Sequence, residues 1–275
     1  MKPVNFEYAR PKDLDASLSL LAEDGRSVKV VAGSQSLGPM LNMRLVQPDL
    51  LVDVTGIDEL RQVKEEADGI VIGACITHSD IEDRRVPDVT CGALPSVAHG
   101  IAYRAVRNRG TIGGSLTHAD PSADWISILA ALGGSVTLRG PQGVRTIPVE
   151  DYMLGALEAD LRPGELLVSV TAPRLDRSAR WGYHKICRKT GEFAHAIGAF
   201  VVDPERGVCR AVIGAIETRP IVIADARAII ADGAPGRFDT KAADELARSA
   251  GMNDPLERQT HVVALRRAVE RAGAR

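Results

Sequence analysis

Cysteine is scarce in this sequence, and the four residues lie far apart, at Cys75, Cys91, Cys187 and Cys209. None of them forms a Cys-x-x-Cys pair, which argues against a zinc ribbon or an iron–sulfur cluster held by this chain alone. Long apolar runs are absent as well, and without a stretch of about 18 apolar residues we expect no membrane-spanning helix. The N-terminus has no apolar signal core, so we expect a cytoplasmic protein.

Charge of one sign is not concentrated along the sequence. The 275 residues carry a formal net charge of −2, with 25% charged and 45% hydrophobic residues. Because binding to a phosphate backbone needs a basic face, we do not expect a nucleic-acid partner. The arginines between Arg258 and Arg275 are interpreted as the solvated side of a helix. The length is sufficient for about two domains with buried cores.

Several motifs of nucleotide-binding and hydrolytic proteins are also missing. There is no Gly-x-Gly-x-x-Gly fingerprint of a Rossmann site and no Gly-x-Ser-x-Gly elbow of a serine hydrolase. The spacing from Gly33 to Gly38 matches the glycines of a P-loop, but Pro39-Met40 stand where that motif needs Lys and Ser or Thr. His118 and Asp120 have no third ligand at a telling spacing, so a metal site is not predicted.

Two short glycine-bearing segments, about eighty residues apart, are the most informative feature that is present. The first runs from Val31 to Leu37 and the second from Gly110 to Ser115. Glycine permits positive φ and lets a ligand approach the backbone, and consecutive amides form an anion-binding concavity. We therefore predict that the two segments hold the two phosphates of one dinucleotide. Taken singly, each segment is also compatible with an ordinary turn.

Hydrophobic periodicity and turn signals predict strands and helices along the whole chain. Thr77 to Asp80 matches a capping box that starts a short helix, and Asp120 followed by Pro121 is predicted to cap a helix that ends at Gly133. Beyond a candidate domain boundary near 173–178, strands are followed by helices, which suggests a separate α+β domain. The predicted strands are 28–31, 50–54, 60–63, 70–72, 136–138, 144–147, 166–170, 183–187, 196–202 and 208–216, and the other predicted helices are 14–21, 95–106, 221–231, 240–250 and 257–271.

At the two glycine-bearing segments the sequence resembles the FAD-binding medium subunit of the molybdenum hydroxylases, the xanthine dehydrogenase and carbon monoxide dehydrogenase family. Members have a segment similar to Ala-Gly-Gly-His/Gln-Ser-Leu, a second similar to Thr-Ile-Gly-Gly-Asn/Ser, and an Asp nine residues after the latter. Here these are 32–37, 111–115 and Asp124, and the similarity extends over nearly the whole chain, including 6–11, 39–45, 189–194 and 265–269. Ser34 stands where glycine is usual, and if that position needs positive φ, a cost of about 1 kcal/mol is expected.

The resemblance implies an α+β fold in two domains. Residues 1–176 are expected to form a two-part FAD-binding domain of the vanillyl-alcohol-oxidase type, with its two subdomains split near residue 57. Residues 177–275 are expected to form a C-terminal α+β domain with a three-stranded sheet and a helical bundle. Some relatives carry an inserted iron–sulfur loop with cysteines, and this sequence shows none.

The resemblance also implies which residues bind one non-covalent FAD between the two segments. Backbone amides of 32–36 and 111–115 are expected to bind the pyrophosphate, Asp124 to hold hydroxyl groups, and Phe193 with His195 to line the flavin ring. Phe193 stands where some relatives have a tyrosine, so the aromatic face is kept and a hydroxyl is lost. The full set of expected cofactor-binding residues is Val31, Ala32, Gly33, Ser34, Gln35, Ser36, Leu37, Thr111, Ile112, Gly113, Gly114, Ser115, Asp124, Leu167, Phe193 and His195.

By this resemblance the chain is expected to be an oxidoreductase, the flavoprotein subunit of a heterotrimeric molybdenum hydroxylase. A large partner subunit is expected to hold molybdopterin and a small one two [2Fe-2S] clusters, whose electrons pass through the FAD of this chain to an external acceptor. A dimer of heterotrimers is expected. The substrate stays open, because the large subunit chooses it.

Two other classes of function stay open at the level of the sequence. One is a self-sufficient flavin-dependent oxidase or reductase on the same fold, which needs a substrate pocket with a general base. The candidate bases His78, His99 and His184 form no constellation that supports it. The other is a nucleotide-binding interaction subunit without redox activity, which a flavin absorbance spectrum of the purified chain distinguishes from the flavoproteins.

Overall fold

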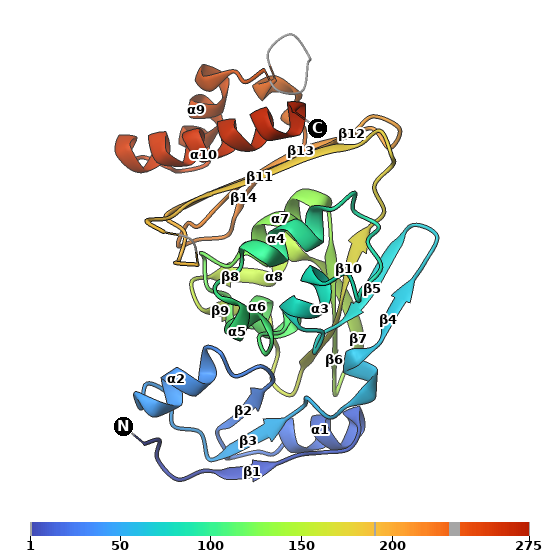
Figure 1. Ribbon diagram of the computed structural model, residues 1–275. Helices are drawn as coiled ribbons and strands as arrows, with labels where there is room; N and C mark the ends of the chain where they lie inside the picture. Colours follow the sequence, from blue (N-terminus) through green and yellow to red (C-terminus); the bar gives the residue numbers. More distant parts are fainter. Residues whose placement is uncertain (1, 190, 231–236, 275) are drawn as a thin grey trace.

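The computed structural model describes residues 2–189, 191–230 and 237–274, which form three stacked layers (Figure 1). The N-terminal layer is a parallel three-stranded sheet in the order β1-β3-β2 with two helices. The buried face of its central strand packs with the first helix around Leu14, Leu50 and Val52. Its elements are β1 (Glu7–Ala9), α1 (Leu14–Leu21), β2 (Val28–Val31), α2 (Leu37–Asn42) and β3 (Leu50–Asp53), followed by a 3₁₀ helix at Asp58–Arg61.

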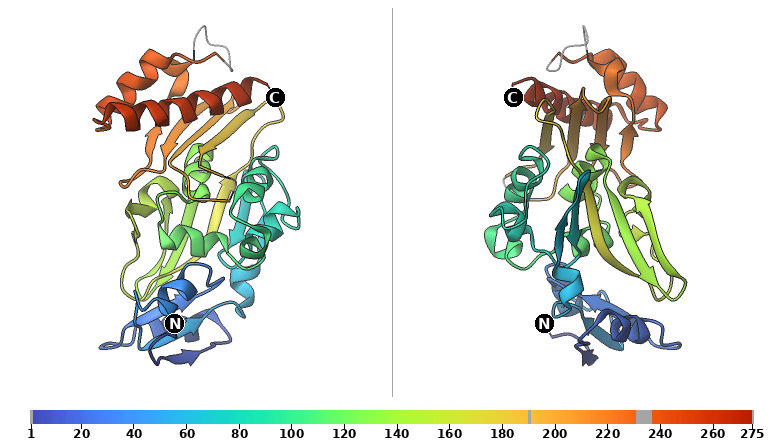
Figure 2. Two further views of the ribbon diagram at one scale, coloured as in Figure 1. Left: turned by 60° about the vertical axis from the view of Figure 1, so that its left-hand side comes forward. Right: turned by 90° about the vertical axis from the view of Figure 1, so that its right-hand side faces the viewer.

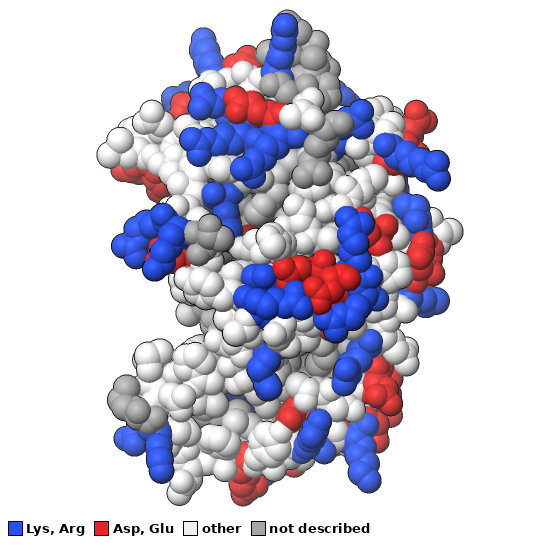
Figure 3. Space-filling view, in the orientation of Figure 1, with Lys and Arg blue, Asp and Glu red and all other residues white. Residues whose placement is uncertain are grey.

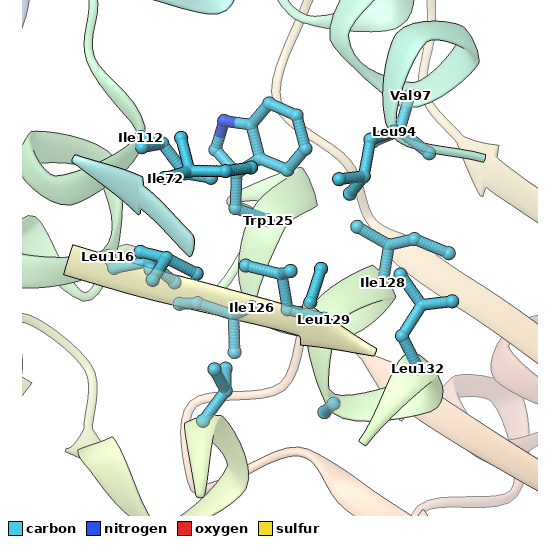
Figure 4. Close-up of a cluster of buried hydrophobic side chains, with 14 of the residues drawn as sticks. Ile72, Leu94, Val97, Ile112, Leu116, Trp125, Ile126, Ile128, Leu129 and Leu132 are labelled. Carbon is cyan, nitrogen blue, oxygen red and sulfur yellow. The ribbon is translucent and has the colours of Figure 1, made fainter. Parts of the chain in front are cut away.

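The middle layer is built on an antiparallel five-stranded sheet in the order β4-β5-β10-β6-β7. Helices flank this sheet, and the apolar core lies between them (Figure 4). The elements are β4 (Val63–Glu65), β5 (Gly69–Gly73), α3 (His78–Glu82), α4 (Ala93–Gly100), α5 (Arg104–Arg107), α6 (Ile112–His118), α7 (Asp124–Leu132), β6 (Ser135–Gly140), β7 (Gly143–Pro148), α8 (Val149–Tyr152), β8 (Met153–Gly155), β9 (Glu158–Ala159) and β10 (Leu166–Pro173).

The C-terminal layer is an antiparallel four-stranded sheet in the order β11-β12-β13-β14. α10 packs on one face and α7 on the other (Figure 2). An added Cβ at Gly198 would lie 2.5 Å from the Ala264 carbonyl oxygen, so glycine lets the long helix lie directly on the sheet. The elements are β11 (Arg180–Ile186), β12 (Ala196–Asp203), β13 (Val208–Gly214), β14 (Ile221–Ile223), a 3₁₀ helix at Ala226–Ile229, α9 (Thr240–Ser249) and α10 (Pro255–Gly273).

The α+β fold class is confirmed. The predicted capping box is also present, because the Thr77 side chain accepts from the Asp80 amide while the Asp80 carboxylate accepts from the Thr77 amide. The division into 1–176 and 177–275, with a split near 57, stays a prediction; residue 176 lies in the connection between β10 and β11. In the described part of the chain, no helix has both the length and the apolar character needed to cross a membrane.

The predicted start of a helix at Asp120 and Pro121 is wrong. The Asp120 carboxylate instead accepts from the amide and hydroxyl of Ser122, which closes a local turn. α7 begins three residues later, at Asp124, with Ala123 at its N-cap. The Asp120 side chain therefore stabilises the turn that precedes α7 and does not cap the helix.

Two other helix predictions are wrong. The predicted helix 95–106 is divided into α4 and α5, because Ala102 adopts a left-handed φ of 41°. The predicted helix 221–231 is β14 and a 3₁₀ helix over its described residues, and residue 231 lies outside them. A short apolar run does not distinguish strand from helix by periodicity alone. As a result, the C-terminal sheet has four strands over the described residues and not the three expected.

Candidate functional site

A cavity of about 1080 Å³ opens where the three layers meet, and both glycine-bearing segments lie on its wall. Ligand pockets in proteins have volumes of roughly 300–1,000 Å³, so the space is sufficient for a large ligand. Thirteen of the sixteen predicted site residues line it, all except Val31, Ile112 and His195. Ile112 is fully buried in the core of the middle layer. The thirteen are Ala32, Gly33, Ser34, Gln35, Ser36, Leu37, Thr111, Gly113, Gly114, Ser115, Asp124, Leu167 and Phe193.

The first segment leaves the end of β2 and turns into α2 with its amides unused. Among the described residues, no acceptor is present for the amides of Gly33, Ser34, Gln35 and Ser36. Ser34 adopts a left-handed φ of 60°, the conformation for which a cost of about 1 kcal/mol was expected. Four neighbouring amides without an acceptor on a cavity wall are suited to binding an anion.

The two segments meet directly, although about eighty residues separate them in the sequence. A Cβ added at Gly33 would lie 2.0 Å from the carbonyl oxygen of Arg109 and 2.7 Å from the Cα of Gly110. Real Cβ atoms do not approach backbone this closely, so the contact requires glycine at position 33. The absence of a side chain at position 33 therefore allows the two segments to lie against each other on the wall of the same cavity.

The second segment is the first turn of α6, and its amides are already engaged. Thr111 is the N-cap, and its hydroxyl accepts from the Gly114 amide. The amides of Ile112, Gly113 and Ser115 donate to the carbonyl oxygens of Ile76, Ala74 and Thr111. The expectation of free amides here is wrong for all but Thr111, whose amide has no acceptor among the described residues. Thr111, Gly114 and Ser115 of this segment line the cavity.

Asp124 lies on the cavity wall but is held by two residues of β11 that the sequence reasoning missed. Lys185 Nζ donates to both Asp124 carboxylate oxygens at 3.0 and 3.1 Å, and the Tyr183 hydroxyl donates to one of them at 2.7 Å. Burial raises the pKa of Asp124 in spite of the neighbouring lysine, and burial with the carboxylate raises that of Tyr183. The predicted role of Asp124, holding ligand hydroxyls, stays a prediction.

Of the two residues predicted to line the flavin ring, Phe193 lines the cavity and His195 does not. Phe193 is 77% exposed and lines the cavity at its edge, so an aromatic face is available there. His195 is exposed and outside the cavity wall, and its amide donates to the Ile186 carbonyl. Because β12 begins at the next residue, the position of His195 follows the sheet pairing rather than the cavity.

The three candidate bases have different partners in the described structure. His99 is exposed and contacts the Glu82 carboxylate, and His184 contacts Arg267 on α10. His78 alone lines the cavity, where it is buried against Trp125. Sequence reasoning named His78 as a candidate base, but no local signal indicated that it contributes to the cavity wall.

Comparison with known proteins identifies related sequences and structures. Residues 4–175 match the family described as FAD binding domain in molybdopterin dehydrogenase. The chain is 37% identical over 207 residues to the carbon monoxide dehydrogenase medium chain of Hydrogenophaga pseudoflava, which covers 75% of this chain and 72% of that protein. It is 36% identical over 210 residues to the 6-hydroxypseudooxynicotine dehydrogenase complex subunit alpha of Paenarthrobacter nicotinovorans, covering 76% and 71% of the two.

The fold is also similar to that of a solved structure. A chain of carbon monoxide dehydrogenase from Hydrogenophaga pseudoflava, solved in a form that lacks the Mo-pyranopterin moiety of the molybdenum cofactor, matches with a TM-score of 0.88. The two chains are 31% identical, and the match covers 100% of this chain and 99% of the other.

Proposed function

Since the chain belongs to the family of FAD-binding domains in molybdopterin dehydrogenases, we propose that it carries electrons from the iron–sulfur clusters of a small partner subunit to an external acceptor through its FAD. It is an oxidoreductase subunit of the medium-chain type in molybdenum hydroxylases. A flavin supplies the chemistry that joins one-electron donors to two-electron acceptors, and the protein binds and orients it.

The observation that carries this proposal is the row of four unengaged amides from Gly33 to Ser36 on the wall of the shared cavity. A pyrophosphate needs several donors at once, and these amides supply them without a charged side chain. The contact of Gly33 with Arg109 sets the second segment beside them. The residues present therefore fit the binding of the FAD diphosphate at this junction.

We further propose that the chain assembles with a large molybdopterin subunit and a small [2Fe-2S] subunit, in a dimer of heterotrimers in the cytoplasm. The names of the relatives support a multisubunit enzyme, since they describe a medium chain and a subunit of a dehydrogenase complex. Those two names refer to different substrates, carbon monoxide and 6-hydroxypseudooxynicotine. The substrate is therefore assigned to the large subunit and not to this chain.

Rapid mixing tests the electron transfer directly. The small subunit is reduced under anaerobic conditions, freed of excess reductant, and mixed with the oxidised, FAD-loaded chain. We expect the visible absorbance of the flavin to fall, because the clusters donate to it, and to stay constant with the oxidised small subunit as control. Constant absorbance in both mixtures would contradict the relay and favour the self-sufficient flavoenzyme.

A further inference from the structure

His78 is a buried residue at the start of α3, and its ring faces the second glycine-bearing segment. The capping box between Thr77 and Asp80 fixes the backbone at this position. The residue is 4% exposed, and it lines the large cavity. A Cβ added at Gly110 would come within 2.8 Å of the His78 Nε2 atom. Glycine at position 110 therefore leaves the space in which this nitrogen lies.

The hydrogen bond from Trp125 determines which ring nitrogen of His78 carries the proton. The indole Nε1–H donates to the Nδ1 atom at 3.1 Å, so Nδ1 is an acceptor and the neutral ring carries its proton on Nε2. Trp125 is fully buried among Ile72, Ile112 and Leu129, which holds the indole in place (Figure 4). Burial, with the nearby Arg107 guanidinium, lowers the pKa of His78 to about 4, so the ring is neutral at pH 7.

The Nε2–H group that results has no hydrogen-bond partner among the described residues. Among the described residues, this nitrogen is not one of the fully buried side-chain atoms that lack a partner, so it is accessible although the residue as a whole is buried. A donor that the protein leaves unpaired on the wall of a ligand cavity is available to a ligand acceptor. Because the ring is neutral, it offers this hydrogen bond without adding a positive charge.

We propose that the Nε2–H group of His78 donates a hydrogen bond to an oxygen of the FAD bound in this cavity, which makes His78 a cofactor-binding residue. The inference rests on the binding of FAD by this chain. It gives the His78–Trp125 pair a function: Trp125 fixes the tautomer, and His78 presents the donor.

The chain offers a matched pair of substitutions at this position. His78→Asn keeps a polar atom where Nδ1 lies, so the Trp125 indole keeps its acceptor, but nothing replaces Nε2. His78→Gln places an amide nitrogen near the position of Nε2 and so keeps a donor. His184→Asn, at a histidine of β11 that contacts Arg267 on α10 and does not line the cavity, serves as the control.

The measurement is the affinity of the full-length chain, freed of FAD, for added FAD, from the quenching of flavin fluorescence. We expect His78→Asn to raise the Kd about tenfold, which corresponds to about 1.4 kcal/mol. His78→Gln should recover a large part of this loss, and His184→Asn should bind as the wild type does. Equal affinity of His78→Asn and wild type would overturn the inference and leave the proposed function intact. Failure of the wild type to bind FAD would overturn both.

A second measurement needs no variant and so does not depend on the folding of one. The nitrogen-15 chemical shifts of the His78 ring report its tautomer in the wild-type chain. We expect the proton on Nε2 between pH 5 and 8, without titration, and a downfield shift of that proton when FAD is added. A proton on Nδ1, or an Nε2–H resonance that FAD does not move, would show that this nitrogen does not donate to the cofactor.

Discussion

The glycines of the two segments are required by protein atoms and not by unusual backbone angles. Gly33 contacts the Arg109 carbonyl, and a Cβ at Gly113 would lie 2.5 Å from the Ala74 Cβ. Neither has a positive φ, whereas Ser34, a residue with a side chain, does. Glycines in such segments are expected to supply positive φ. Here close packing requires Gly33 and Gly113 instead, and Ser34 adopts the left-handed conformation.

Substitution Gly33→Ala tests this explanation. The new methyl group would overlap the Arg109 carbonyl oxygen, so the two segments must separate. We expect a loss of about 1–3 kcal/mol in the free energy of unfolding and a large loss of FAD affinity, measured by chemical denaturation and fluorescence titration. Gly100→Ala is the control, because nothing lies within 4 Å of its added Cβ. Wild-type FAD binding by Gly33→Ala would contradict the packing argument.

At the scale of elements, an ion-pair network joins α3 to α5 and to the segment between α4 and α5. Figure 3 shows it as an acidic cluster framed by basic side chains over these helices. Glu82 of α3 accepts from Arg104 and Arg107, and Arg107 also donates to the carbonyl oxygens of Ile101 and Ala102. Because Ile101 and Ala102 line the cavity, the network holds part of its wall in place.

The network predicts a specific response of stability to acid. The guanidinium of Arg107, with His99 and Arg104, lowers the pKa of Glu82 from 4.5 to about 2. Because the folded state has the lower pKa, the stabilisation is complete above about pH 4.5 and is lost as the pH falls towards 2. We expect Glu82→Gln to lower the free energy of unfolding at pH 7 by about 2 kcal/mol.

Denaturation at a series of pH values provides the measurement. The stability difference between wild type and Glu82→Gln should shrink as the pH falls from 4.5 to 2, because protonation of Glu82 removes the same interaction. Glu158→Gln, at an exposed position, is the control and should follow the wild type. A difference that stays constant over this range would contradict the role assigned to Glu82.

At the scale of the whole molecule, the cavity belongs to no single layer. The N-terminal layer supplies Gly33, the middle layer Asp124 and the C-terminal sheet Lys185. The ion pair of Asp124 and Lys185 therefore joins α7 to β11 beside the cavity, with Lys185 also donating to the Gly100 carbonyl. The relative position of the middle and C-terminal layers is therefore coupled to the shape of the cavity.

Removing one partner of this pair should affect both stability and binding. Lys185→Met leaves the Asp124 carboxylate buried without its cation, and we expect a loss of about 3–5 kcal/mol in the free energy of unfolding, together with weaker FAD binding. The double variant Asp124→Asn with Lys185→Met should regain much of the stability, since no buried charge remains. Lys189→Met, at a side chain that is 68% exposed, is the control. Chemical denaturation gives the free energy of unfolding of the wild type, the single variant, the double variant and the control. Equal losses in the single and double variants would argue against a buried-charge effect.

The sequence by itself determined the elements whose signals are local. β2 lies at the predicted residues, the Thr77 capping box forms as predicted, and the two final helices lie near their predicted positions, because periodicity and caps depend on neighbours in the chain. The family resemblance, which extends over nearly the whole chain, gave the fold class and the cofactor. The helix predicted to start at Asp120 is wrong because Asp120 and Ser122 form a turn there. The helix predicted at 221–231 is wrong because 221–223 pair with β13 as a strand.

Only the tertiary structure decided which side chains and amides face the cavity. Trp125, the partner of His78, is 47 residues away in the sequence, and Asp124, the partner of Lys185, is 61 residues away. No local sequence pattern could therefore predict either contact. The amides of 112–115 look free in the sequence, yet the carbonyl oxygens of Ala74 and Ile76 engage two of them. The physical reason is that a hydrogen-bond donor is used or unused according to what packs beside it, and distant parts of the chain come together only in the folded state.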